Sequence, residues 1–255
     1  RNVTGVQTCA LPISEGISVL INGGKEVGEW LASSSKIPLI SATGSTTMGK
    51  KVAVAVAQRL GKSLLELGGN NAIIISEEAD LDIAIRGAVF GAIGTAGQRC
   101  TTTRRLIVQE SIYEAVKQKL ITAYSQIKIG TPLDTAYHMG PLIDQQAVTQ
   151  YLSAIQSCEK SGGNFIVKGG VLEGTGFESG CYVKPCIAEV THDLPIVHTE
   201  TFAPILYLIR YSTLQEAIDA TKYKNEYFMQ HRKGVKNGGA KFLNVRSEEH
   251  TSELQ

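Results

Sequence analysis

Short apolar runs alternate with longer amphipathic segments along most of the chain. Short apolar runs bounded by turn residues predict buried strands, whereas apolar positions that recur every three or four residues predict helices. This pattern predicts strands over residues 17–21, 37–41, 63–67, 72–76, 105–108, 164–168, 182–190 and 205–210. It predicts helices over residues 26–33, 46–60, 79–94, 111–124, 144–162 and 214–221. Because strands and helices alternate, we expect an α/β fold with a doubly wound parallel sheet.

Three of the predicted helices carry a more specific signal. Ser111, followed three residues later by Glu114, predicts a capping box at the start of one helix. Two other helices show an apolar stripe, which is formed by Val27, Trp30 and Leu31 in the first and by Val148, Leu152 and Ile155 in the second. These stripes are expected to face the core.

The composition is typical of a soluble globular protein. With 255 residues, 43% of them hydrophobic and 19% charged, the chain can bury a sizeable core in one or two domains. No apolar stretch reaches the roughly 18 residues that cross a bilayer, and a formal net charge of +1 indicates neither nucleic-acid nor membrane binding. Five cysteines without a CxxC pair predict neither a disulfide framework nor a metal site, which favours a cytoplasmic protein.

Both ends of the chain differ in character from its middle. Residues 1–13 and 246–255 resemble translations of a sequencing adapter in two directions, so we expect both to be non-native. A signal peptide is the alternative for residues 1–13, which lack a charged start followed by a long apolar run. Residues 226–245 have no periodicity, which indicates a frame error, a chimeric join or an insertion. We therefore expect a fragment of a longer gene.

One thiol lies in a run of small and polar residues. Cys100 stands within Gly94-Thr95-Ala96-Gly97-Gln98-Arg99-Cys100-Thr101-Thr102-Thr103-Arg104-Arg105, and no bulky apolar residue follows until Leu106. Structural cysteines usually have aliphatic neighbours, so this setting makes a reactive thiol plausible while a packing role stays open. The other three cysteines outside the adapter-like ends are expected to pack in the core: Cys158, Cys181 and Cys186.

A carboxylate lies 34 positions before Cys100 inside an apolar run. Glu66 stands in Leu64-Leu65-Glu66-Leu67-Gly68-Gly69-Asn70-Asn71-Ala72. Such a glutamate is usually a solvated edge residue, but in an apolar site its pKa rises and it becomes a candidate general base. A thiol nucleophile with such a base is suited to covalent attack on a carbonyl carbon.

Taken together, these stretches resemble the aldehyde dehydrogenase superfamily. Three further blocks match in the correct order: Thr43-Gly44-Ser45-Thr46-Thr47-Met48-Gly49, Gly140-Pro141-Leu142-Ile143 and Glu200-Thr201-Phe202-Ala203-Pro204. The resemblance covers residues 16–225, and its wording is closest to the branch that oxidises α-aminoadipic semialdehyde. It implies the end of a Rossmann-type cofactor domain over residues 14–75 and an α/β catalytic domain over residues 76–225, both incomplete.

The resemblance also implies a mechanism. Cys100 would attack the aldehyde to give a thiohemiacetal and then a thioester, and Glu66 would activate the water that releases a carboxylate. The backbone N–H of Cys100 would be one oxyanion donor. Arg99 and Thr101 would contact the substrate, although Arg99 pairing with a structural acid is an equal alternative.

The cofactor implied by the resemblance is NAD, and the sequence does not rule out NADP. The residues that would bind it are Thr43, Gly44, Ser45, Gly49, Leu67, Gly68, Glu200 and Phe202. Two bland alternatives stay open, because Ser45 could merely cap a helix and Glu200 could merely cap the turn before Pro204.

Two other functions deserve comparison with the oxidation of an aldehyde. An inactive homologue kept for subunit contacts is one, and an acylating enzyme that uses coenzyme A is the other. Intact Cys100, Glu66 and Glu200 favour a hydrolytic enzyme, and family members commonly form homo-oligomers. The asparagine that serves the family as a second oxyanion donor would precede Arg1, so we expect this fragment alone to have little activity.

Overall fold

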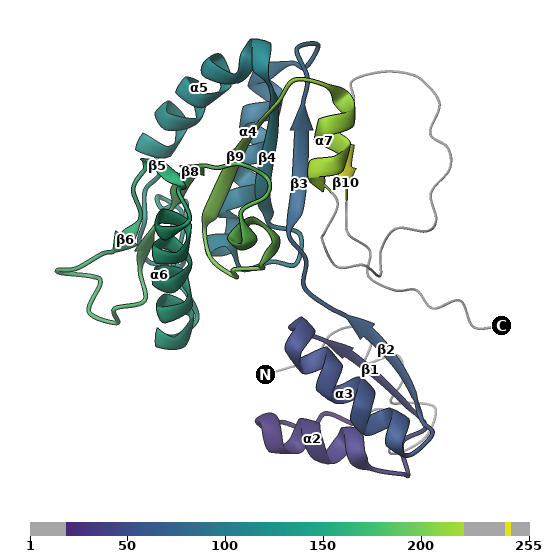
Figure 1. The fold of residues 1–255 in the computed structure, drawn as a ribbon. Helices are drawn as coiled ribbons and strands as arrows, with labels where there is room; N and C mark the ends of the chain where they lie inside the picture. The colour runs from purple at the N-terminus through teal and green to yellow at the C-terminus, as the bar shows by residue number, and fades with distance from the viewer. Residues whose placement is uncertain (1–18, 222–242, 246–255) are drawn as a thin grey trace, which may run out of the picture. The chain divides into compact units, whose positions relative to one another are not determined.

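The computed structural model describes residues 19–221 and 243–245 (Figure 1). The chain divides into two compact units, of which the first ends at Leu67 and the second begins at Gly68. This division falls eight residues before the expected domain boundary after residue 75. The difference arises because the strand over residues 71–75 pairs within the sheet of the second unit.

The first unit is a small α/β layer. Its elements in chain order are helix α2 (Lys25–Ser33), strand β1 (Leu39–Thr43), helix α3 (Thr46–Gln58) and strand β2 (Lys62–Glu66). The two strands pair in parallel, with Thr43 opposite Glu66. Ser45 is the N-cap of α3, and its Oγ accepts a hydrogen bond from the Met48 backbone N–H.

The second unit is built on a six-stranded sheet. Its strands are β3 (Asn71–Ile75), β4 (Thr103–Gln109), β5 (Asn164–Val167), β8 (Cys186–Glu189), β9 (Ile205–Tyr211) and β10 (Leu243–Val245). Their order in the sheet is β10-β3-β4-β9-β8-β5. The four central strands are parallel, whereas β10 and β5 run antiparallel at the two edges. The expected parallel sheet is therefore correct for the centre and wrong for the edges.

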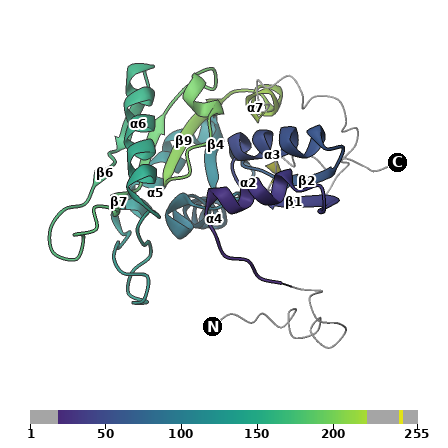
Figure 2. The ribbon, with the colours of Figure 1, turned by 90° about the horizontal axis from the view of Figure 1, so that it is seen from below.

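Helices cover both faces of this sheet (Figures 1 and 2). Helices α4 (Leu81–Ile93) and α5 (Tyr113–Ser125) lie on one face, and α6 (Gln145–Lys160) and α7 (Leu214–Thr221) lie on the other. The connections contain a two-stranded sheet and three 3-10 turns: β6 (Gly170–Val171) with β7 (Val183–Lys184), η1 (Gly94–Gly97), η2 (Glu110–Ile112) and η3 (Pro195–His198). The central strands are buried on both sides, as doubly covered parallel strands require.

Three local expectations, for the first predicted strand and for the apolar stripes of two helices, differ from the structure. Residues 19–21 of the first predicted strand are exposed and irregular, and among the described residues no strand pairs with them. Trp30 is 66% exposed, whereas its neighbours Val27 and Leu31 are half-buried. In α6 the buried stripe is formed by Val148, Tyr151, Ala154 and Cys158, so that Leu152, at 43% exposure, lies outside it.

The predicted capping box of α5 is wrong. A 3-10 turn precedes the helix, and the N-cap residue Ile112 makes no side-chain cap. Ser111 instead donates to the Glu77 carboxylate, while Glu114 pairs with Arg210. At this helix, contacts with Glu77 and Arg210 therefore replace the local capping hydrogen bonds.

The predicted strand over residues 182–190 is interrupted at Pro185. Proline lacks the backbone N–H that a central strand donates, so the run is divided into β7 and β8. Residues 1–13 and 246–255 lie outside the described residues, as does most of 226–245. Within the described residues no helix is long and apolar enough to cross a membrane.

The buried centre of the sheet makes a stability prediction. Ile107 is fully buried in β4, between β3 and β9, so truncation to alanine should lower the free energy of unfolding by about 2–5 kcal/mol. The matched variant Ile143→Ala, at a position 84% exposed, should change it by less than about 0.5 kcal/mol. Urea unfolding followed by far-UV circular dichroism measures both; equal losses would contradict the assigned core.

Candidate functional site

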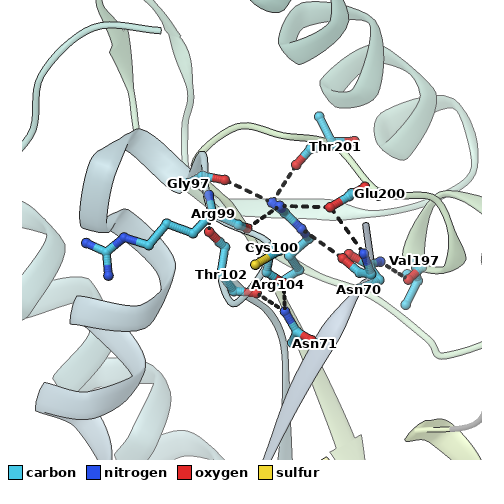
Figure 3. A network of polar contacts seen from close by, with 11 residues as sticks. Asn70, Asn71, Gly97, Arg99, Cys100, Thr102, Arg104, Val197, Glu200 and Thr201 are labelled. Atoms are coloured by element: carbon cyan, nitrogen blue, oxygen red, sulfur yellow. Dashed lines mark hydrogen bonds and ion pairs between the residues drawn. The ribbon is translucent and has the colours of Figure 1, made fainter. Parts of the chain in front are cut away.

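Cys100 lies at the tip of a tight turn between η1 and β4 (Figure 3). The Thr102 N–H donates to the Arg99 carbonyl at 3.1 Å, and the Arg99 N–H donates to Thr102 Oγ1 at 3.1 Å. These two bonds close a four-residue turn, with Cys100 and Thr101 at its exposed central positions. The thiol is thus presented to solvent by a backbone that is fixed on both sides.

A left-handed segment precedes this turn. Thr95 and Ala96 both have φ near 53°, and Gly97 has a φ of 72°. A Cβ on Gly97 would lie 2.4 Å from the backbone of Ala203, so glycine is required at that position. The Gln98 amide then bonds the Pro141 carbonyl and the Ile143 N–H, which explains why a second motif block lies beside the nucleophile.

Asn71 holds the turn from below. Its Nδ2 donates to the Cys100 carbonyl at 2.6 Å and to the Thr102 carbonyl at 3.0 Å. Asn71 is buried at the start of β3, where a polar side chain needs hydrogen-bond partners, and these two carbonyls are its acceptors. One side chain therefore binds the turn at its centre, through Cys100, and at its end, through Thr102.

Glu200 lies beside this turn and is held by polar contacts from two segments. Its Oε1 accepts from the Gly69 N–H at 3.3 Å and lies 3.4 Å from Arg104 Nη2 (Figure 3). Its Oε2 would be 1.8 Å from a Cβ on Gly68, so the carboxylate occupies the space that a larger residue would fill. Position 68 must therefore be glycine for the Glu200 carboxylate to keep this place.

A cavity of about 520 Å³ lies next to Glu200. It is formed between α6 and residues 195–201, and it is lined by Thr149, Gln150, Ser153, Ala154, Ser157, Ser161, Pro195, Ile196, Thr199, Glu200 and Thr201. Phe202 follows this lining and is partly exposed. A carboxylate among hydroxyl groups is suited to binding a polyhydroxyl ligand.

Glu66 and the remaining predicted cofactor residues belong to the first unit. Glu66 ends β2 and is exposed; Gly44 donates its N–H to the Glu66 carbonyl, next to Thr43. Gly49 is buried, and a Cβ there would lie 2.4 Å from the Leu67 side chain; its role in a cofactor site stays a prediction. The pairing of Glu66 with Cys100 stays a prediction.

Ser45 caps α3, which was the alternative to a role in cofactor binding. Its hydroxyl accepts from Met48, which leaves the hydroxyl hydrogen free to donate to a ligand at the same helix start. The backbone N–H groups of the first turn point the same way, so capping and anion binding are compatible.

Arg99 turns away from the sulfur (Figure 3). Its Nε donates to Thr95 Oγ1, and its guanidinium carbon lies 5.1 Å from the Phe90 ring centroid. Among the described residues its contacts therefore include no carboxylate, unlike the predicted structural pairing. Its role toward a substrate, like that of Thr101, stays a prediction.

Two residues organise this site. Sequence reasoning gave Asn71 no role, and it expected Arg104 to assist the Cys100 thiolate electrostatically without predicting the contacts that Arg104 makes. Arg104 is buried and bonds the carbonyls of Gly97, Arg99 and Thr201 as well as Glu200. Its position was a usable signal, because a charge in a strand that continues with Leu106, Ile107 and Val108 must find partners. The described residues contain no cluster of three side chains that could hold a metal ion.

The cysteines differ in environment, which makes a reactivity prediction. Burial, with a contribution from Glu159, raises the pKa of Cys158 to about 11, and burial raises the pKa of the Cys186 thiol further. A thiol with that pKa is about one part in a thousand ionised at pH 8, and the thiolate is the nucleophile. Iodoacetamide at pH 8 should therefore alkylate exposed Cys100 well before Cys158 or Cys186.

Peptide mapping by mass spectrometry measures this order, with guanidinium-unfolded protein as the control in which the thiols react alike. Preferential labelling of Cys158 in the folded protein would contradict the exposed-nucleophile assignment. As the pH rises toward the raised pKa of Cys158, its labelling should increase, because more of the thiol becomes thiolate.

Comparisons with known proteins agree with this geometry. The family model described as "Aldehyde dehydrogenase family" matches residues 6–225. The alpha-aminoadipic semialdehyde dehydrogenases of Mus musculus and Bos taurus are each 47% identical to this chain, over 80% and 78% of its length. The chain spans only 37% and 36% of the length of these two relatives.

Solved structures give the same result. A betaine aldehyde dehydrogenase from Staphylococcus aureus, crystallised in complex with NAD+, matches with a TM-score of 0.75 at 30% identity. The match covers 79% of this chain and 40% of that one. Since the family model covers most of the sequence, this chain belongs to the aldehyde dehydrogenase family.

Proposed function

We propose that the protein encoded by the whole gene oxidises an aldehyde to a carboxylate with NAD as the cofactor. The observation that carries this proposal is the exposed Cys100 on a turn anchored by Asn71 and by Arg104, which also pairs with Glu200. An exposed thiol at the end of a conformationally fixed loop is typical of a nucleophile, not of a packing residue.

The reaction follows from the groups on this chain. The Cys100 thiolate attacks the aldehyde carbon, and the resulting oxyanion accepts a hydrogen bond from the Cys100 N–H. A bound nicotinamide cofactor supplies the acceptor for the hydride that leaves this carbon. The remaining thioester on Cys100 is hydrolysed by water that Glu66 deprotonates, which releases the carboxylate and restores the thiol.

The residues that would hold the cofactor fit its chemistry. A pyrophosphate suits the start of α3, where Ser45 keeps a hydroxyl hydrogen and the first-turn N–H groups are available. A ribose suits the Glu200 carboxylate, because an ionised carboxylate accepts from hydroxyl groups. Thr43, Gly44, Gly49, Leu67 and Phe202 complete the proposed cofactor site.

The substrate is proposed to be an aldehyde that carries a distal carboxylate, such as α-aminoadipic semialdehyde. The 47% identity to alpha-aminoadipic semialdehyde dehydrogenases supports this choice. Arg99 would pair with that carboxylate and Thr101 would contact the substrate beside the sulfur. For Arg99 to do so, its side chain must leave the Thr95 and Phe90 contacts that it now makes. A cytoplasmic homo-oligomer stays the expected setting.

The mechanism predicts different defects for its two catalytic residues. In the protein encoded by the whole gene, Cys100→Ala should abolish NADH formation, because no covalent adduct can form. Glu66→Gln should retain a single burst of NADH and then turn over at least about tenfold more slowly, since only thioester hydrolysis needs the base. Stopped-flow absorbance at 340 nm separates the two. Full turnover by Cys100→Ala would reject the mechanism and favour a different chemistry.

The packing of Gly68 against Glu200 predicts a binding defect. Gly68→Ala should force the carboxylate away from its place, because the new methyl group would overlap Oε2, and should weaken NAD binding by about tenfold, or about 1.4 kcal/mol. Gly87→Ala is the matched control, since nothing lies within 4 Å of its Cβ position in α4. Calorimetric titration of NAD measures both variants; unchanged affinity in Gly68→Ala would remove Glu200 from the cofactor site.

A further inference from the structure

Arg104 stands at an irregularity of the sheet. In the pairing of β3 with β4, Asn71 is opposite Thr103 and Ala72 is opposite Arg105, so Arg104 is inserted between two consecutive register pairs. Such β-bulges are rare between parallel strands and occur next to active sites, where they redirect a side chain. The side chain redirected here is a cation that is 1% exposed.

The Arg104 guanidinium uses all five of its N–H donors. Nη1 donates to the carbonyls of Thr201 at 2.6 Å and Gly97 at 3.2 Å. Nη2 donates to the Arg99 carbonyl at 3.2 Å and to Glu200 Oε1 at 3.4 Å. The remaining donor, Nε, donates to the Gly69 carbonyl at 3.4 Å. No other protonated side chain offers five donors in a fixed planar fork.

The contact with the Arg99 carbonyl has a consequence for the nucleophile. This carbonyl and the Cys100 N–H belong to one trans peptide plane, so they point in opposite directions and move together. A donor on the carbonyl therefore sets the direction of the N–H, which is the proposed oxyanion donor. The Thr102 N–H binds the same carbonyl and adds to the constraint.

The guanidinium also contacts the cofactor side, and Nη2, which donates to the Arg99 carbonyl, is the nitrogen nearest to Glu200. The guanidinium pairs with Glu200 and bonds the Thr201 carbonyl, and its central carbon lies 5.3 Å from the centroid of the Phe202 ring. Figure 3 shows the guanidinium between the Gly97–Thr102 segment and the Glu200–Thr201 segment. One rigid plane thus touches both the nucleophile turn and the proposed nicotinamide-ribose carboxylate.

We propose that Arg104 is a positioning residue that couples nucleotide binding at Glu200 to the orientation of the Cys100 N–H. The inference rests on the proposed function. Binding of the ribose holds the Glu200 carboxylate, the carboxylate holds the guanidinium, and the guanidinium holds the Arg99 carbonyl. The nucleophile turn is then most ordered when the cofactor is bound.

Arg105 provides a matched control. It is as buried as Arg104 and also bonds backbone carbonyls, namely those of Asn70, Ala220 and Thr221. These acceptors include the last turn of α7 and neither Glu200 nor the Arg99 carbonyl. Arg104→Lys and Arg105→Lys therefore both remove a buried guanidinium, whereas only the first disturbs the proposed link.

The experiment measures NAD affinity and backbone hydrogen exchange in the protein encoded by the whole gene. Arg104→Lys should weaken NAD binding by about tenfold, while Arg105→Lys should leave it within about twofold of wild type. In a Glu200→Gln background, Arg104→Lys should cause no further loss, because the two act through one contact. NAD should slow exchange of the Thr102 amide in wild type and in Arg105→Lys but not in Arg104→Lys.

Each result bears on a separate claim. Additive losses in the Arg104→Lys, Glu200→Gln double variant, or NAD protection of Thr102 that survives in Arg104→Lys, would overturn the coupling. Should Arg104→Lys fail to fold, Arg104→Gln, which leaves no buried charge, undergoes the same measurements. If wild type itself binds no NAD, the proposed function fails instead.

Discussion

A buried cation must be surrounded by acceptors, and this requirement shapes the region around Cys100. Leaving a guanidinium unpaired inside a protein is far more costly than any single hydrogen bond is favourable. Arg104 therefore requires carbonyl oxygens to converge on it, and they come from chain segments near residues 69, 97–99 and 200–201. Segments that lie about a hundred positions apart in sequence are brought to one point by this demand, and the nucleophile turn is one of them.

The same region stores backbone strain. Thr95 and Ala96 adopt the left-handed conformation, which costs of order 1–3 kcal/mol for each non-glycine residue and persists only where the surroundings determine it. Here the Thr95 carbonyl accepts from the Gln98 N–H and from its amide, and the Thr95 hydroxyl accepts from Arg99. These contacts offset the strain. The turn that follows is consequently held in one conformation, as a nucleophile that must meet a substrate in a defined geometry requires.

Sequence alone predicted most elements and the family, but not the contacts between side chains of different segments. Strands and helices such as β4, β9, α3 and α4 follow from periodicity, and Cys100, Glu66 and Glu200 follow from motifs. Among the expectations that failed, the capping box did so because the partner of Ser111 lies in another segment, and the α6 stripe did so at Leu152, which is exposed. The contacts of Arg104 and Asn71 were not predicted, because these side chains bond backbone carbonyls. Every residue has a backbone carbonyl, so the spacing of residue types in the sequence does not show which carbonyl will be the acceptor.

The two oxygens of Glu200 show how small residues and charged ones combine in this site. Oε1 is held by the Gly69 N–H and by Arg104, while Oε2 rests against the Cα of Gly68. Neither glycine contributes a side chain, yet one supplies a donor and the other supplies room. A carboxylate restrained in this way loses little further freedom when a hydroxyl ligand binds, so less of the binding free energy is spent on ordering it. The paired glycines after Glu66 are therefore best understood as part of the Glu200 site, although 131 positions separate Gly69 from that carboxylate in the chain.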